Sequence, residues 1–193
     1  MQTAYLNEVS EIRTGYSFRK AQSLQEETGL LGLQINDLRH MKVVDPSRLT
    51  AIEWPGRGDP PVLKSGEVVI AAKGNENYAA IYLGNERNII PSSQLLVITV
   101  NNPHRVSPQF LCWLLNYPDI QQKLVELQTG SNIYSLSKKA LQHLQVPIPT
   151  QETQEQLLRL ARLYEEEERL TNDLLKNREV MVHALSKKLL YGK

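Results

Sequence analysis

The chain has 193 residues, of which 41% are hydrophobic and 22% are charged. This is the composition of an ordinary globular protein, and it excludes a disordered chain. The 22 Lys and Arg residues against 21 Asp and Glu residues give a net charge of +1, and the signs are nearly balanced in both residues 1–150 and residues 151–193. Binding to nucleic acid, which a strong positive excess would announce, must therefore depend on local patches.

Cysteine, histidine and hydropathy set further limits. Cys112 is the one cysteine and lies in the apolar run FLCWLL, which predicts a buried thiol and no internal disulfide. The four histidines are scattered without the spacing of metal ligands, so we expect no metal site. We also expect a cytoplasmic protein without a membrane segment, because the N-terminus lacks a signal pattern and no apolar run approaches about 18 residues.

The first sixty residues contain few regular patterns. Leu6, Val9 and Ile12 are apolar at a spacing that fits either a helical turn or a strand. Residues 13–29 are polar with interleaved basic and aromatic side chains, which suits either contact with phosphates and bases or a solvated loop. Residues 30–35 predict a strand, and the proline-rich WPGRGDPP that comes later predicts a loop.

Residues 64–150 alternate between strands and short helices. Residues 67–72 and 79–83 predict a strand pair joined by a polar hairpin tip, and residues 92–100 predict another strand. A helix around Phe110 gives way at Pro118 to a second helix, and Ser137 is the candidate N-cap of a third. An extended piece containing Pro147 and Pro149 follows. We therefore predict an α+β domain over residues 1–150.

Residues 151–193 predict one long helix, because neither Gly nor Pro occurs from residue 151 to residue 191. Such a helix would be roughly 55–60 Å long at 1.5 Å per residue, longer than a domain of this size is wide. One face is apolar along most of its length, and we assign it to dimerisation: Leu157, Leu160, Leu163, Leu170, Leu174, Met181, Leu185 and Leu189. The alternative is a helix that packs wholly on its own domain.

Motifs for catalysis are missing. The hairpin tip has no Gly-Lys-Ser/Thr and is no P-loop, and the chain has no Gly-x-Ser-x-Gly elbow. Gly56 and Gly58 form a Gly-x-Gly in a proline-rich loop without a third glycine. We expect a protein that is not an enzyme, although a nuclease site made of scattered acidic residues would leave little local signature.

Several stretches, in the same order, resemble the DNA specificity subunit of type I restriction-modification systems. They are LNEVSEIRTGYSF, LKSGEVVIAAKGNENYAAIY, SPQFLCWLLNYPDIQQKL, GSNIYSLSKKALQHLQVPIP and the final KKLLYGK. This sequence departs from the family at Glu67, where Asp is usual, and at Thr150 and Thr153-Gln154, where a proline and Glu-Gln are common. The family usually carries two recognition domains and two spacer helices, so this chain resembles a half subunit.

The resemblance implies a function without catalysis. In the family, each target-recognition domain reads one half of a split DNA site, and paired antiparallel helices set the spacing between the halves. S-adenosylmethionine is expected on a partner methyltransferase subunit, and this chain is expected to bind no cofactor. The expected partners are double-stranded DNA, methyltransferase subunits and a second copy of the chain joined through a coiled-coil-like helix pair.

Polar side chains in loops and at the ends of predicted elements are the candidates for DNA contact, with Asn and Gln suited to adenine, Arg to guanine, and Lys to phosphate. They are Arg13, Ser17, Arg19, Lys20, Gln34, Asn36, Arg39, Lys73, Asn75, Asn77, Tyr78, Ser131, Asn132, Tyr134, Lys138 and Lys139. Three other interpretations stay open: an orphan DNA-binding module of another system, a nuclease with an unrecognised acidic site, and a scaffold that pairs through its helix without binding DNA.

Overall fold

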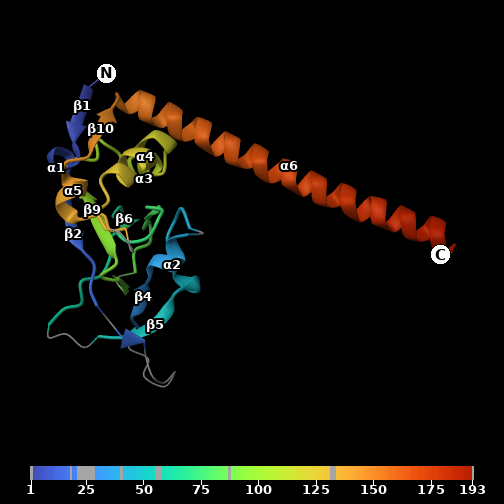
Figure 1. Ribbon diagram of the computed structural model, residues 1–193, viewed down its shortest axis with the longest axis horizontal. Coiled ribbons are helices and arrows are strands. Elements are labelled where there is room, and N and C mark those ends of the chain that lie inside the picture. The colour runs from blue at the N-terminus through green and yellow to red at the C-terminus, as the bar shows by residue number, and fades with distance from the viewer. Residues whose placement is uncertain are drawn as a thin grey trace. The chain divides into compact units, whose positions relative to one another are not determined.

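The computed structural model divides into two compact units, residues 1–154 and residues 155–193 (Figure 1). At Arg19 and Lys20 it describes only the backbone. The described residues are 2–17, 19–20, 29–39, 41–54, 58–86, 88–130 and 134–192.

The first unit contains a four-stranded antiparallel sheet in the order β2-β9-β6-β7. Its strands are β2 (Ser10–Thr14), β9 (Leu95–Val100), β6 (Val68–Ala71) and β7 (Ala79–Ile81). The β6–β7 pair is the strand pair that the sequence predicts, with Val68 opposite Ile81. Every residue of β6 is buried, which explains its unbroken apolar run in place of alternation.

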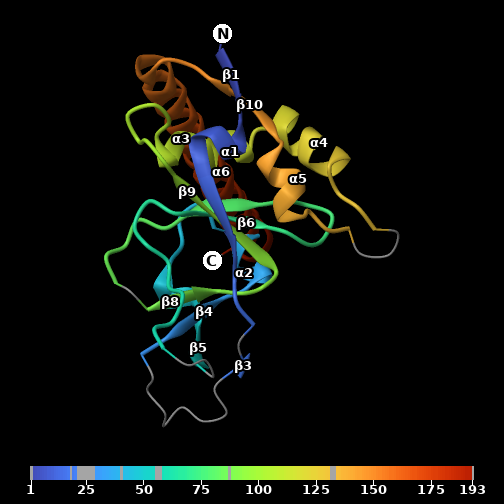
Figure 2. The same ribbon diagram turned by 90° about the vertical axis from the view of Figure 1, so that its left-hand side faces the viewer.

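A second sheet of four strands has the order β3-β5-β4-β8. Its strands are β3 (Arg19–Lys20), β5 (Thr50–Glu53), β4 (Leu31–Leu33) and β8 (Ile89–Pro91), and β4 pairs with β8 in parallel. In Figure 2, β4, β5 and β8 lie below β6. The sequence prediction included β4 but lacked β5 and β8, which are only four and three residues long.

The principal core cluster draws on both sheets and on the segment between them. Leu33 of β4 and Ile89 of β8 pack with Val69 and Ala71 of β6 and with Val97 of β9. On the first sheet, α3 (Pro108–Leu115) contacts β6 and β7. Its side chains Phe110, Leu111 and Leu114 are buried there. The unit is thus layered as helix, sheet and sheet, which confirms the predicted α+β class.

Residues 2–14 resolve the ambiguity of the N-terminal pattern, because they contain both a helical turn and strands. β1 (Gln2–Tyr5) is followed by the single turn α1 (Leu6–Val9) and directly by β2. Leu6 and Val9 are buried from the turn, and Ile12 is buried from the strand. β1 pairs antiparallel with β10 (Gln145–Ile148), the last strand of the unit.

The remaining helices of this unit begin at a serine or a proline, of which the sequence analysis named Pro118 and Ser137. Ser107 caps α3 by accepting a hydrogen bond from the Phe110 N–H, and Pro118 is the first residue of α4 (Pro118–Glu126). Ser137 caps α5 (Lys138–Gln142) in the same way. Two further short elements, α2 (Ile35–Leu38) and the 3₁₀ turn η1 (Pro46–Arg48), connect β4 to β5.

The long C-terminal helix α6 (Gln151–Tyr191) has 41 residues, as the absence of Gly and Pro predicts. Gly192 follows with a positive φ of 65°, the conformation in which glycine ends helices. Gln154 is the buried residue of α6: its amide donates to the Arg105 and Pro149 carbonyls and accepts from the Ser107 N–H. Because all these partners belong to residues 1–154, the first turn of α6 is tied to the globular unit.

Within the described residues, the structure contains no helix apolar enough to span a membrane.

Candidate functional site

The loop between β6 and β7 is held rigid from inside. The Asn77 side chain is completely buried, donates to the Ala71 carbonyl at 2.7 Å, and accepts from the Gln128 amide at 2.8 Å. Gln128 also donates to the Gly74 carbonyl, and Gly74 has a φ of 99° that favours glycine. The exposed Lys73, Asn75 and Glu76 of this loop are therefore displayed on a preorganised backbone.

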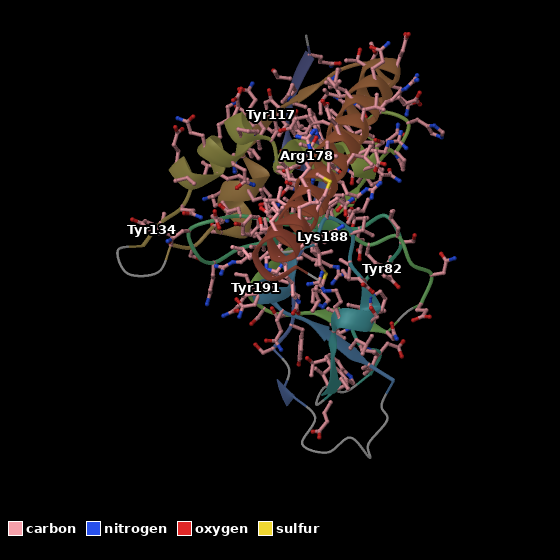
Figure 3. All side chains as sticks on the ribbon, turned by 90° about the vertical axis from the view of Figure 1, so that its right-hand side faces the viewer. Tyr82, Tyr117, Tyr134, Arg178, Lys188 and Tyr191 are labelled. Carbon is pink, nitrogen blue, oxygen red and sulfur yellow. The ribbon has the colours of Figure 1, made fainter. Side chains whose placement is uncertain are left out.

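The segment after α4 runs beside this loop. Lys73 forms a β-bridge with Ser135, the Gly74 N–H donates to the Tyr134 carbonyl, and the Leu136 N–H donates to the Ala72 carbonyl. Tyr134 is 46% exposed and stands at the edge of the unit in Figure 3. The structure thus places the candidate Tyr134 beside the hairpin tip, about sixty residues away in the sequence.

A hollow of about 600 Å³ joins α2 to the same loop. Asn36 and Arg39 of the α2 region line one side, and Lys73, Asn75 and Tyr78 line the other. A second hollow, of about 700 Å³, also includes Arg39, Asn75 and Tyr78. Five of the sequence candidates therefore share one concave surface, which we call the α2–loop surface.

Glu76 and Gln94 also belong to this surface, and the sequence analysis did not include them. The Tyr78 hydroxyl donates a short hydrogen bond to the Glu76 carboxylate. That bond raises the pKa of Tyr78, while the positive charge of Arg39 acts in the opposite direction. The sequence analysis missed Glu76 because it searched for basic and amide side chains. It missed Gln94 because only the fold shows that this turn lies beside the loop between β6 and β7.

Arg13 has a structural role, because its positive charge is paired with a buried carboxylate. Its guanidinium donates to the Glu67 carboxylate at 2.9 Å and to the Pro61 and Val62 carbonyls at 3.4 and 3.2 Å. Glu67 is 3% exposed and also accepts from Thr99 and from the Lys64 N–H. This ion pair joins β2 to the segment before β6. Arg13 and the buried Asn77 are therefore outside the α2–loop surface, and their contact with DNA stays untested.

Gly15, Tyr16 and Ser17 lie against the turn after β8. A Cβ atom on Gly15 would meet the Ser92 carbonyl oxygen at 2.0 Å, so only glycine fits. The Tyr16 ring packs at 4.7 Å from the Trp54 ring, and the Ser17 hydroxyl donates to the Ser93 hydroxyl. Tyr16 and Ser17 are exposed and form a second polar and aromatic patch.

The other candidates have separate positions. Gln34 precedes α2, where its N–H donates to the Asp37 carboxylate. Lys138 and Lys139 are exposed on α5, and the Ser137 hydroxyl already occupies the Ala140 N–H at the start of this helix. Arg19 and Lys20 form β3 through backbone pairing with β5. Ser131 and Asn132 lie outside the described residues.

The apolar stripe of α6 is exposed in this structure. Leu160, Leu163, Leu170, Leu174, Met181, Leu185 and Leu189 have between 51% and 86% of their surface accessible, and Leu157 is half-buried. Figure 3 labels Arg178, Lys188 and Tyr191 among the side chains of this helix. Arg169 pairs with Glu166 at 2.7 Å and with Asp173 at 3.2 Å along its polar side. Exposed rows of this length mark interaction surfaces.

Within the described residues, no three His, Cys, Asp or Glu side chains gather to hold a metal ion. Burial raises the pKa of the Cys112 thiol to about 12. A protonated, enclosed thiol is a poor nucleophile.

Solved structures of type I restriction-modification subunits share this fold. The S subunit from M. genitalium matches with a TM-score of 0.58 and 12% identity, over 96% of this chain and 45% of that one. A chain from work on complex assembly and conformational transition of the type I system has a TM-score of 0.61 and 20% identity, over 97% and 43%. The HsdS subunit from Thermoanaerobacter tengcongensis matches with a TM-score of 0.59 and 17% identity, over 86% of this chain and 37% of that one.

This chain therefore spans less than half the length of these relatives, and at such identities the likeness establishes the fold alone. Comparison with curated protein sequences finds no match. The model of the type I restriction modification DNA specificity domain, however, matches residues 1–177, most of the chain. With the mixed sheet unit and the long helix in place, this match shows that the chain belongs to the family of type I restriction-modification DNA specificity domains.

Proposed function

We propose that this protein reads one half of a split DNA site, that two copies pair through α6, and that the pair docks methyltransferase subunits. The observation that carries the proposal is the combination, in a DNA specificity domain, of the α2–loop surface with a 41-residue helix whose apolar stripe is exposed. One feature suits base contact and the other suits assembly.

The α2–loop surface supports DNA reading by its chemistry. Asn36 and Asn75 offer amides, Arg39 offers a guanidinium, and Lys73 offers an ammonium group, all on one concave surface. Amides and guanidinium groups discriminate between base edges, whereas lysine suits phosphate. The braced loop adds affinity, because a group that is already ordered loses little conformational entropy on binding.

The surface of α6 supports pairing and a further partner. Leu163, Leu170, Leu174 and Met181 form one row, with successive spacings of seven, four and seven residues. A second row runs beside it through Tyr164, Leu175 and Val182, all of them more than half exposed. Tyr164 and Val182 are roughly five helical turns apart and share one direction. An apolar face two rows wide exceeds the seam of a two-helix pair, so we assign the additional width to a methyltransferase subunit.

We assign no catalytic step to this chain. Methylation and S-adenosylmethionine binding are expected in the methyltransferase partner, and the complex is expected in the cytoplasm. This chain would place the methyltransferase partner at its DNA site. Contacts with phosphates would fix the register of the chain on DNA, and contacts with base edges would determine the sequence at which the partner acts.

The molar mass in solution tests the assembly. Light scattering after gel filtration, over a concentration series to tens of micromolar, should give a dimer of about 44 kDa, twice the 22.0 kDa chain. Co-expression with a type I methyltransferase subunit should yield a complex that stays together in moderate salt. A monomer at every concentration that also fails to retain the methyltransferase subunit would contradict the proposal.

A further inference from the structure

Glu76 is an acidic side chain on the surface to which we assign DNA contact. A carboxylate beside phosphates is repelled, so it contributes nothing to general affinity for DNA. In the major groove, a carboxylate finds a partner in the N4 amino group of cytosine, which donates a hydrogen bond. An exposed Glu on a DNA-reading surface therefore suits selectivity.

The Glu76 carboxylate is held in place by its neighbours. The Tyr78 hydroxyl donates to it, and the Tyr78 ring packs against the main core cluster. Between the two residues, the buried Asn77 fixes the backbone through Ala71 and Gln128. A carboxylate positioned by a packed tyrosine and a pinned backbone can discriminate between base edges without first becoming ordered.

Arg39 lies across the same hollows. It lines both of them together with Glu76 and Tyr78, and its charge acts on the Tyr78 hydroxyl. Arg39 is exposed and, within the described part of the chain, forms no ion pair. Guanidinium groups bind O6 and N7 of guanine.

We propose that Arg39 and Glu76 together read one G·C base pair, with Tyr78 as a positioning residue. In the major groove a G·C pair presents two acceptors on guanine and one donor on cytosine. Arg39 supplies donors for the first and Glu76 supplies an acceptor for the second. This inference rests on the proposed DNA-reading function and deepens it by naming the base pair and its readers.

Selection from random double-stranded DNA tests the inference. The full-length protein is incubated at low salt with a library of random duplexes, and bound sequences are counted for the natural protein and for Glu76→Gln, Arg39→Ala and Tyr78→Phe. The natural protein should enrich a site with a fixed G·C pair. Glu76→Gln and Arg39→Ala should each reduce the preference at that pair by roughly 5- to 100-fold.

Tyr78→Phe keeps the ring and removes the hydroxyl that holds Glu76. Preference at the same pair should fall while the thermal midpoint and the salt dependence of binding stay unchanged, which distinguishes a positioning role from a structural one. Glu126→Gln is the matched control: it removes the same charge from an exposed position on α4, outside both hollows, and should leave the selected site unaltered.

The outcomes separate the two proposals. If the natural protein enriches a site and neither Glu76→Gln nor Arg39→Ala changes it, the reading of G·C is wrong and the DNA-reading function stands. The shared base pair is also wrong if the two substitutions alter different positions. If the natural protein enriches no sequence over random DNA, the proposed function fails and this inference fails with it.

Discussion

Arg13 donates to the buried carboxylate of Glu67 at 2.9 Å and thereby connects β2 to the segment that enters β6. Glu67 is satisfied from three directions, since Thr99 and the backbone of Lys64 also donate to it. These three donors come from three separate segments, and they compensate for the burial of the Glu67 carboxylate.

Removing Arg13 should therefore lower stability and leave sequence preference unchanged. Arg13→Ala leaves a buried carboxylate without its cation, and we expect a loss of about 2–3 kcal/mol in the free energy of unfolding. Urea denaturation measures the loss. Arg105→Ala, which removes an exposed arginine from the same unit, is the control and should cost under about 0.5 kcal/mol. If Arg13→Ala has the same free energy of unfolding as the natural protein but enriches a different DNA sequence, Arg13 contacts bases.

Gly15 should not tolerate even one methyl group. A Cβ atom there would lie 2.0 Å from the Ser92 carbonyl oxygen and 2.6 Å from that of Pro91, both of them backbone atoms. We expect Gly15→Ala to cost about 2–3 kcal/mol, because β2 must move away from the turn after β8. Thermal or urea unfolding gives the value. Ser17→Ala, two residues away, loses one exposed hydrogen bond and should be nearly neutral.

Lys138 is predicted to contact phosphate. Lys138→Ala should weaken binding by a similar factor on all DNA sequences and reduce the salt slope by about 1. Titration of selected and random duplexes at several salt concentrations measures both quantities. The control is Lys123→Ala, which removes an exposed lysine from α4. A changed sequence preference with an unchanged salt slope would show that Lys138 reads bases.

The apolar stripe of α6 should tolerate charge poorly once two copies pair. Leu174→Asp places a carboxylate in the middle of the stripe, and we expect self-association to weaken more than about tenfold. Val180→Asp makes a comparable change on another face of the same helix and should leave association intact. Light scattering on both variants tests this. Equal effects of the two variants would assign the weakening to helix stability and not to the stripe.

Cys112 should resist thiol reagents in the folded protein. Its pKa is raised to about 12 by burial, so the thiol stays protonated from neutral pH to pH 9, where an ordinary cysteine would be largely ionised. We expect labelling with an aromatic disulfide reagent to be slow at pH 9 and to become complete in urea. Fast labelling of the native protein at pH 9 would show that the helix α3 opens readily.

The sequence predicted best where one local pattern decides the structure. The long run without Gly or Pro sufficed for α6, and Pro118 and Ser137 each marked the start of a helix. Strands β5 and β8 were missed because neither lies in an apolar run as long as the LLGLQI around β4, and their pairing partners are distant in the sequence.

The candidate site shows the same limit more sharply. Asn75 and Asn77 are both polar residues of one loop, yet the first is exposed and the second is completely buried. What separates them is Gln128, which follows α4 in the chain and donates to the Asn77 side chain. No local pattern contains that contact, so the sequence identified the loop but could not say which of its side chains face outward.

The pairing of β1 with β10 brings the two ends of the globular unit together. Gln2 lies opposite Ile148, so the chain enters the globular unit and leaves it toward α6 at nearly the same place. Because the two ends of the unit lie side by side, the residues between them can be replaced without displacing either end. An exchange of the chain between these two points would replace the α2–loop surface and leave α6, to which we assign pairing, unchanged.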